Sequence, residues 1–177
     1  MWDTILEILS RKAAEGVDVR VLYDDFGCIT RLPGNYPRQL REMGIRAHAF
    51  KPFVPVLSGR LNNRDHRKLM IIDGKAAFTG GVNLADEYIN EYEKYGHWKD
   101  IGFRLTGQAV MNYVLMFEEF WCAFCDKNDE LPERHELQPV QIPEQKDGYV
   151  ISYYDSPLRI DSISNDLYID LLSQAVD

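Results

Sequence analysis

The amino-acid sequence predicts an α/β domain in which helices flank a mixed β-sheet. Two observations carry this prediction. Segments with helical apolar spacing alternate along the chain with short runs of alternating or branched apolar residues, which is the pattern of a layered α/β fold. In addition, 45% of the 177 residues are apolar, enough for one substantial core in a single domain with an appendage.

The N-terminal part of the chain alternates helix and strand. Asp3–Glu15 has apolar residues at helical spacing, and Gly16 follows it as a signal that ends the helix. The elements expected next are a strand at Val17–Tyr23, a helix at Tyr36–Met43 and a short strand at Ile45–Phe50. Lys51–Pro55 is expected to be extended or looped, because proline removes a backbone donor and biases its predecessor away from helix.

A hairpin is expected in the middle of the chain. Lys68–Ile72 is rich in branched apolar residues and ends at the turn-prone pair Asp73-Gly74, and Ala76–Thr79 is expected to return beside it. The later elements expected are a helix over Leu84–Glu91, a strand over Trp98–Leu105, a helix over Gly107–Asp126 burying Val110, Val114, Phe117 and Trp121, a strand over Tyr149–Tyr154, and a helix over Ser162–Ala175.

The formal net charge of −8 is unevenly distributed. Residues 1–125 carry equal numbers of acidic and basic side chains, so the acidic excess lies beyond residue 125. The balance is locally basic near the middle of the chain, where Arg60, Arg64, Arg67, Lys68 and Lys75 outnumber Asp65 and Asp73. This predicts a local positive field, although a solvated mixed-charge loop is an equal alternative for Arg60 and Arg64. The absence of a broad basic face makes nucleic acid an unlikely partner.

The cysteines and the hydropathy pattern restrict the compartment. An odd cysteine count, Cys28, Cys122 and Cys125, indicates a reducing compartment without structural disulfides. The pair Cys122 and Cys125 is interpreted as buried helical residues rather than a metal or redox site, because no second pair accompanies it. No apolar run reaches the length of about 18 residues that spans a bilayer, and the chain as given is expected to be soluble.

One short span holds the residues that point to chemistry: His66, Lys68, Asp73, Gly80, Gly81 and Asn83. On a strand, His66 and Lys68 would share a face about 7 Å apart, close enough to grip one phosphate from two directions. Asp73 would then face the opposite side, which favours a structural role. Gly80 and Gly81 allow a sharp bend and a close approach to a ligand, and Asn83 can cap a helix or donate to a phosphate oxygen.

This set suits attack on phosphorus. A neutral imidazole nitrogen of His66 can act as the nucleophile, while the Lys68 ammonium offsets charge that builds on the non-bridging oxygens. The chemistry requires no metal and no other cofactor. A lone histidine would be an ordinary strand or surface residue, and the six matching positions favour chemistry instead.

Together these residues form the pattern HxKxxxxDxxxxxxGGxN, which resembles the motif of the phospholipase D superfamily. The surroundings resemble the bacterial cardiolipin synthase branch, in the stretches Gly80–Tyr88, Tyr95–Asp100, Arg104–Val110 and Phe117–Trp121. Gly81 stands where many phospholipases and nucleases of the superfamily carry serine, which favours the synthase branch. The resemblance implies a phospholipase D-like layered domain.

The resemblance also implies site roles. Enzymes of this superfamily use two such motifs, and one histidine forms a phosphohistidine while the other protonates the leaving group. His66 is then the nucleophile candidate, Lys68, Asn83, Gly80 and Gly81 bind the phosphate, and Asp100 orients the histidine ring. The implied substrate is an anionic phospholipid, phosphatidylglycerol, which donates its phosphatidyl group and releases glycerol. His97 is interpreted as a solvated loop residue.

The motif occurs once in the chain, which suggests half of a catalytic site. The expected organisation is a first phospholipase D-like catalytic half over residues 1–126, a linker over 127–147 and a truncated start of a second half over 148–177. The missing second half or a second subunit would then be needed, and the full-length protein is expected at the bacterial cytoplasmic membrane. The alternatives are a homodimeric single-motif phosphodiesterase or nuclease of the same superfamily, and a non-catalytic α/β module.

Overall fold

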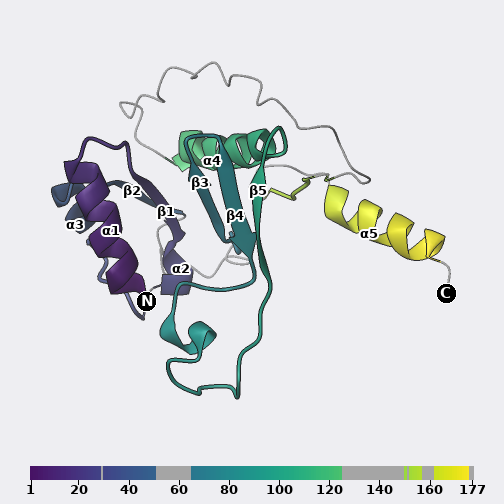
Figure 1. Ribbon diagram of the computed structural model, residues 1–177, viewed down its shortest axis with the longest axis horizontal. Helices are drawn as coiled ribbons and strands as arrows, with labels where there is room; N and C mark the ends of the chain where they lie inside the picture. Colours follow the sequence, from purple (N-terminus) through teal and green to yellow (C-terminus); the bar gives the residue numbers. More distant parts are fainter. Residues whose placement is uncertain (29, 51–64, 125–149, 151, 157–161, 176–177) are drawn as a thin grey trace, which may run out of the picture.

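The structure, a computed structural model, describes residues 1–28, 30–50, 65–124, 150, 152–156 and 162–175. Helices and strands alternate along this part of the chain, which confirms the predicted α/β class (Figure 1). The elements are α1 (Trp2–Ala14), β1 (Arg20–Asp24), α2 (Asp25–Cys28), α3 (Tyr36–Glu42), β2 (Arg46–Phe50), β3 (Leu69–Ile72), β4 (Ala76–Gly80), the 3-10 helix η2 (Asp86–Ile89), β5 (Gly102–Thr106), α4 (Val110–Phe124) and α5 (Ile163–Gln174).

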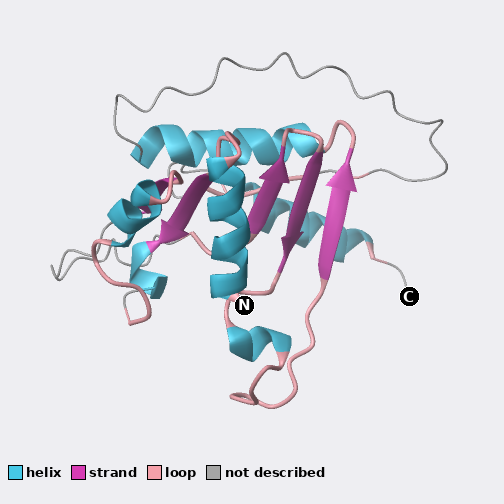
Figure 2. Cartoon of the chain, turned by 60° about the vertical axis from the view of Figure 1, so that its left-hand side comes forward, coloured by secondary structure: helices cyan, strands magenta, loops and turns pink. Residues whose placement is uncertain are grey.

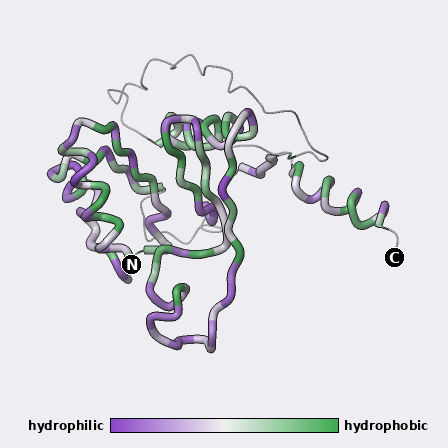
Figure 3. The backbone as a smooth tube through the Cα atoms, in the orientation of Figure 1, coloured by the Kyte–Doolittle hydropathy of each residue, from purple (hydrophilic) through white to green (hydrophobic). Residues whose placement is uncertain are grey.

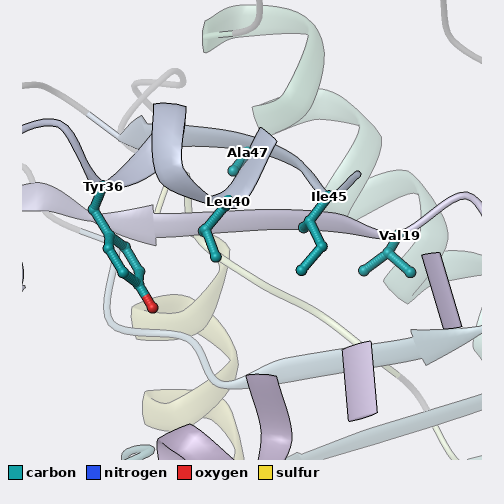
Figure 4. Close-up of a cluster of buried hydrophobic side chains, with 5 residues drawn as sticks. All are labelled: Val19, Tyr36, Leu40, Ile45 and Ala47. Atoms are coloured by element: carbon teal, nitrogen blue, oxygen red, sulfur yellow. The ribbon is translucent and has the colours of Figure 1, made fainter. Parts of the chain in front are cut away.

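Strands β1 and β2 form a parallel pair whose one face packs against α1 and α3. The buried cluster there consists of Val19, Tyr36, Leu40, Ile45 and Ala47 (Figure 4). The apolar stripe of α1 predicted from helical spacing, with Leu6 and Leu9, packs against this cluster. The helix ends as predicted before Gly16, whose φ of 90° is a left-handed conformation that glycine adopts without steric cost.

Helix α4 packs against the other face of β2. The ring of Phe50 lies 5.3 Å from that of Phe120, and the ring of His48 lies 5.0 Å from that of Trp121. Val110 and Trp121 are buried as the sequence predicts, whereas Val114 and Phe117 are only half-buried. The helix also contacts β3 and β4, so it links the parallel pair to the second sheet (Figure 2).

Strands β3, β4 and β5 form an antiparallel sheet in that order. Ala77 of β4 is fully buried on the face that α4 covers, and Ile71 of β3 pairs with it. Because side chains alternate along a strand, Phe78 points to the opposite face, where it is exposed together with its partner Met70. This sheet is therefore covered on one face and open on the other among the described residues.

Several predicted elements differ from the structure. The helix expected over Leu84–Glu91 is only the 3-10 turn η2, and its N-cap is Ala85 rather than Asn83. The strand expected from Trp98 begins at Gly102. Cys122 is exposed, so its interpretation as a buried helical residue is wrong. Helix α2 was not predicted.

The C-terminal part is described in pieces. Helix α5 matches the predicted helix Ser162–Ala175, while Val150 and residues 152–156 are not in a strand. Tyr154 donates its hydroxyl proton to Glu119 Oε2 of α4 over 2.5 Å. The extended segment Lys51–Pro55, Arg60, Arg64, Cys125 and the linker over 127–147 lie outside the described residues. No helix within the described part of the chain combines the length and the apolarity that crossing a membrane requires.

Candidate functional site

The antiparallel register gathers most of the motif at one end of the β3-β4-β5 sheet. Leu69 at the start of β3 pairs with Thr79, and Gly80 at the end of β4 pairs with Gly102 at the start of β5. His66 and Lys68 lead into this end, Gly81 and Asn83 leave it, and Asp100 enters it. We call this the site end of the sheet. From it the connection between β4 and β5 projects as a long loop of largely hydrophilic residues (Figures 1 and 3).

His66 and Lys68 precede β3 and do not lie on it, contrary to the expected strand from Lys68. In this segment the carboxylate of Asp65 accepts the backbone N–H of Arg67 over 3.1 Å, a local side-chain bond of the kind that competes with strand pairing. The Lys68 ammonium donates to the backbone carbonyl of His66 over 2.6 Å, so the two residues remain neighbours. The His66 side chain is exposed at this end.

Lys68 is partly buried, and the Thr79 hydroxyl donates to its carbonyl over 2.9 Å. Burial lowers the pKa of the Lys68 ammonium, because desolvation disfavours the charged form. The carboxylates of Asp65 and Asp100 oppose this shift. Two acids from different segments therefore help to keep Lys68 charged.

Asp100 is held by donors on both sides of its carboxylate. The backbone N–H of Ile101 donates to Oδ1 over 2.7 Å, and the Trp98 indole N–H donates to Oδ2 over 3.1 Å. The Trp98 bond, followed by the Ile101 bond, lowers the pKa of Asp100. The Gly81 backbone N–H donates to the carbonyl of Ile101 over 3.3 Å. Among the described residues, no hydrogen bond joins Asp100 to the His66 imidazole.

Close packing at the site end restricts both motif glycines, Gly80 more strictly than Gly81. A Cβ on Gly80 would lie 2.6 Å from the carbonyl oxygen of Ile101, and a Cβ on Gly81 would lie 2.8 Å from Oδ2 of Asp100. The Ile101 carbonyl is backbone and cannot easily give way, so Gly80 must lack a side chain. At Gly81 the clash is with the end of a flexible side chain, so a Cβ there would make the Asp100 carboxylate shift. The sequence predicted that Gly80 and Gly81 permit a close approach to a ligand. In the structure the groups that approach them closely are the Ile101 carbonyl and the Asp100 carboxylate of the protein itself.

Several contacts fasten the loop between β4 and β5, among them an ion pair between the Met1 amino group and Asp86. The buried carboxylate of Glu87 binds the Arg31 guanidinium through both oxygens and accepts the Tyr92 hydroxyl over 3.1 Å. The Arg31 bond is the main reason that the pKa of Glu87 falls to about 2. Further along, the Asn90 side chain binds the backbone of Trp98. Asn83 lies half-buried where the loop begins, and its carbonyl accepts the N–H of Ala85 over 2.8 Å.

The structure places Asp73 at the other end of the sheet. Asp73 and Gly74 form the turn between β3 and β4, with φ values of 50° and 62°, and the N–H of Lys75 donates to the carbonyl of Ile72 over 2.9 Å. These values match a turn with two left-handed central residues, as the Asp-Gly pair predicts. Asp73 is therefore not brought together with His66, and it is a turn residue rather than one on the opposite strand face.

Spacing alone did not reveal the roles of Thr79, Glu87, Asn90 and Trp98. Trp98 lies in the stretch Tyr95–Asp100, which resembles the synthase branch, but the resemblance does not indicate a partner for its indole. His97 is exposed in this loop, as expected of a solvated residue. Within the described ranges, no three acidic, histidine or cysteine side chains cluster in a way that could hold a metal ion.

Comparison with known proteins identifies the family. The family model for the cardiolipin synthase, phospholipase D-like domain matches residues 2–112, which include the whole site end. The chain belongs to this family. The α/β fold described above is thus a phospholipase D-like domain, in agreement with the resemblance seen in the motif.

Individual relatives agree with the family assignment. A cardiolipin synthase of Staphylococcus aureus strain Mu50 is 42% identical over 67% of this chain, and one of Geobacillus thermodenitrificans is 34% identical over 95% of it. An uncharacterized protein of Streptococcus mutans is 42% identical over the whole chain. The matches span 24%, 33% and 38% of these three relatives, respectively, so the chain corresponds to well under half of each.

Proposed function

We propose that this chain carries the first half of a phosphatidyl-transfer site that makes cardiolipin. A nitrogen of His66 attacks the phosphorus of phosphatidylglycerol, the bond from phosphorus to the glycerol oxygen breaks, and a phosphohistidine forms. The hydroxyl oxygen of a second phosphatidylglycerol then attacks the same phosphorus, the phosphorus–nitrogen bond to His66 breaks, and the hydroxyl proton passes to the second histidine, which had protonated the glycerol; the product is cardiolipin. The observation that carries the proposal is the convergence of Lys68, Gly81 and Asp100 at the sheet end that His66 enters.

The remaining residues have supporting roles in this proposal. Lys68 and Asn83 bind the phosphate, and Lys68 offsets charge that develops on its oxygens. Gly80 and Gly81 let the chain pass close to β5 and to Asp100. Asp100 helps to keep Lys68 protonated and, by the family resemblance, orients the His66 ring when substrate is bound. Asp73 serves the site indirectly, by forming the turn that sets the β3-β4 register.

The proposal assigns only half of the reaction machinery to this chain. The leaving glycerol oxygen needs a proton, and the motif that could supply a second histidine occurs only once in the 177 residues. General acid catalysis contributes about 10²–10⁴-fold, so the isolated chain should show negligible synthase turnover. We assign residues 1–126 to the first half, 127–147 to a linker and 148–177 to the start of a second half. A lipid donor places the full-length protein at the membrane.

An activated substrate separates nucleophilic attack from the missing acid. Bis(p-nitrophenyl) phosphate releases p-nitrophenolate without protonation, so the isolated chain should give a stoichiometric burst and a phosphorus–nitrogen bond on His66. His66→Ala should abolish the burst, and His97→Ala should retain it as the matched control. A wild-type chain without a burst, or a burst that survives in His66→Ala, contradicts the proposal.

The same preparation tests the dimeric alternative. Sedimentation gives the oligomeric state, and a nuclease assay gives the substrate class. A dimer that cleaves nucleic acid would replace the synthase proposal with a single-motif phosphodiesterase, in which two copies of His66 share one site. A monomer that reacts once with the aryl phosphodiester and then stops supports the half-site.

A further inference from the structure

The position of Asp100 depends on a chain of contacts within the loop between β4 and β5. The carboxylate is exposed and lies outside any helix or strand. Its Oδ2 atom is held by the indole of Trp98, and Trp98 is held in turn by Asn90. The chain therefore runs from Asn90 through Trp98 to Asp100, and none of its members belongs to the six-residue motif.

Asn90 holds the backbone of Trp98 with both ends of its side-chain amide. Its Nδ2 donates to the Trp98 carbonyl over 2.8 Å, and its Oδ1 accepts the Trp98 N–H over 2.6 Å. Only an amide offers a donor and an acceptor at this size, so aspartate cannot replace both bonds. Asn90 also has a φ of 59°, a left-handed conformation that asparagine tolerates better than most residues.

Aromatic packing fixes the plane of the Trp98 ring. The ring of Tyr88 meets it edge to face with centroids 4.8 Å apart, and the ring of Tyr95 lies 6.4 Å away. With its backbone held by Asn90 and its ring packed against Tyr88, Trp98 directs its indole N–H toward the Asp100 carboxylate. The acceptor is Oδ2 of Asp100 at 3.1 Å.

We propose that Asn90 and Trp98 are positioning residues that hold the Asp100 carboxylate in the space above Gly81, beside Lys68. This inference rests on the proposed function, since it concerns the site in which Lys68 would meet a substrate phosphate. Neither residue touches the phosphate; both act through Asp100.

The consequence for the site concerns the charge of Lys68. The charges of Asp65, from the segment before β3, and of Asp100, from the segment before β5, raise the pKa of the ammonium and oppose the effect of burial. If Asp100 loses its fixed place, Lys68 keeps only one of these two acids. Its pKa should then fall, and a smaller fraction of Lys68 should be charged at alkaline pH.

The contact can be tested without any substrate, because the chain has three tryptophans whose indole N–H groups have different surroundings. The indole of Trp2 donates to the Tyr36 hydroxyl, and that of Trp121 has no acceptor among the described residues. In ¹H–¹⁵N spectra at neutral pH, Asp100→Asn and Asn90→Gly should each shift the Trp98 indole signal and leave the other two in place. Glycine keeps the left-handed backbone at position 90, so Asn90→Gly removes only the amide.

A second measurement covers the case in which Asp100→Asn fails to fold. In the Trp98→Phe variant, ¹³C titration of the Asp100 carboxyl should give a higher pKa than in the wild type, because an indole bond to the charged form is lost. Trp2→Phe is the matched control and should leave Asp100 unchanged. A Trp98 indole signal that ignores Asp100→Asn in a folded chain, or an Asp100 pKa unchanged by Trp98→Phe, overturns the proposal.

The effect on chemistry is measured by the pH dependence of the nitrophenolate burst. Trp98→Phe should slow the burst on the order of tenfold and move the alkaline limb of the profile to lower pH, whereas Trp2→Phe should do neither. If Trp98→Phe slows the burst but leaves the alkaline limb of the pH profile in place, Trp98 has only a structural role, and its positioning role is overturned. If the wild-type chain shows no burst, the proposed function is contradicted. The NMR spectra then still test the hydrogen bond between Trp98 and Asp100 independently.

Discussion

The two ends of the β3-β4-β5 sheet carry similar residues and use them for different purposes. Each end has a lysine, an aspartate and a glycine. These are Lys68, Asp100 and Gly81 at the site end, and Lys75, Asp73 and Gly74 at the other end, which we call the hairpin end. At the site end, Gly81 does not have a left-handed backbone, and its lack of a side chain leaves room for the Asp100 carboxylate. At the hairpin end, Gly74 has a φ of 62° and is needed for its backbone. Glycine is therefore favoured by close packing at the site end and by backbone conformation at the hairpin end.

The two ends also differ in how far apart along the chain their contacting residues lie. Contacts at the site end connect segments that are distant along the chain, from Lys68 to Asp100. Contacts at the hairpin end join close neighbours, as in the bond from Lys75 to Ile72. Changes at the site end should therefore alter reaction rates with the fold intact, and changes at the hairpin end should alter stability with the reaction intact.

The largest expected effect is loss of the lysine at the site end. Lys68→Met removes the ammonium that offsets charge on the phosphate oxygens, and the rate of the nitrophenolate burst should fall by about 10²–10³-fold. Lys75→Met is the matched control, since Lys75 is exposed at the hairpin end, and its burst should match the wild type. Equal losses in the two variants would mean that the ends do not differ in the way described.

Alanine at position 81 should have the next largest effect. The added Cβ would occupy the space of the Asp100 carboxylate and push it from its donors, and a displacement of about 1 Å can cost about 10²-fold in rate. The burst rate and the Trp98 indole signal should both change. Gly34→Ala is the control, because a Cβ there meets nothing within 4 Å and the backbone is not left-handed. A Gly81→Ala chain with an unchanged burst would show that Asp100 is not required in its present place.

Local patterns in the sequence predicted the regular elements because those elements are stabilised locally. The apolar stripe of α1, the hairpin turn at Asp73 and Gly74, and helix α5 all follow from spacing and turn chemistry. The motif spacing likewise found the six residues, and family resemblance added Asp100. A single sequence was therefore sufficient to predict conformation where residues close together along the chain determine it.

Prediction failed where distant contacts decide the conformation. Leu84–Glu91 has a helical composition, yet Glu87 turns inward to Arg31, 56 positions away, and Asn90 adopts a left-handed backbone to hold Trp98. These contacts outweigh helix propensity, which differs by less than about 1 kcal/mol per residue among ordinary residues. Asp100 was placed in the site, but its hydrogen-bond partners depend on this loop and could not be read from spacing.

Alanine at position 74 should show the opposite signature from alanine at 81. A left-handed conformation costs a residue with a Cβ roughly 1–2 kcal/mol, so Gly74→Ala should lower the free energy of unfolding by about that amount. Urea unfolding measures this loss, and the burst per folded molecule should stay at the wild-type level. Asp73→Asn is the companion variant and should have little effect, because asparagine also tolerates this conformation. A burst that falls with Gly74→Ala in the folded chain would couple the two ends.

The smallest expected effect concerns the ion pair between Glu87 and Arg31, because its contribution to stability changes with pH only under acidic conditions. Hydrogen bonds, of which the Arg31 bond is the largest cause, lower the pKa of Glu87 from 4.5 to about 2, so the unfolded chain binds this proton first as the pH falls. The stabilisation is complete above pH about 4.5 and should be lost as the pH falls towards 2. Unfolding followed through the Trp98 indole signal should show this loss in the wild type, and Glu87→Gln should remove that part of the acid dependence.

An exposed carboxylate on α1 provides the reference for this experiment. Glu7→Gln removes an acidic group from a solvent-exposed position far from the loop along the sequence, and the wild-type acid dependence should persist in that variant. If Glu87→Gln and Glu7→Gln have the same acid profile, Arg31 does not anchor the loop. The geometry of the site end would then rest on its other contacts, among them the bonds of Trp98 and Ile101 to Asp100 and the ion pair between the Met1 amino group and Asp86.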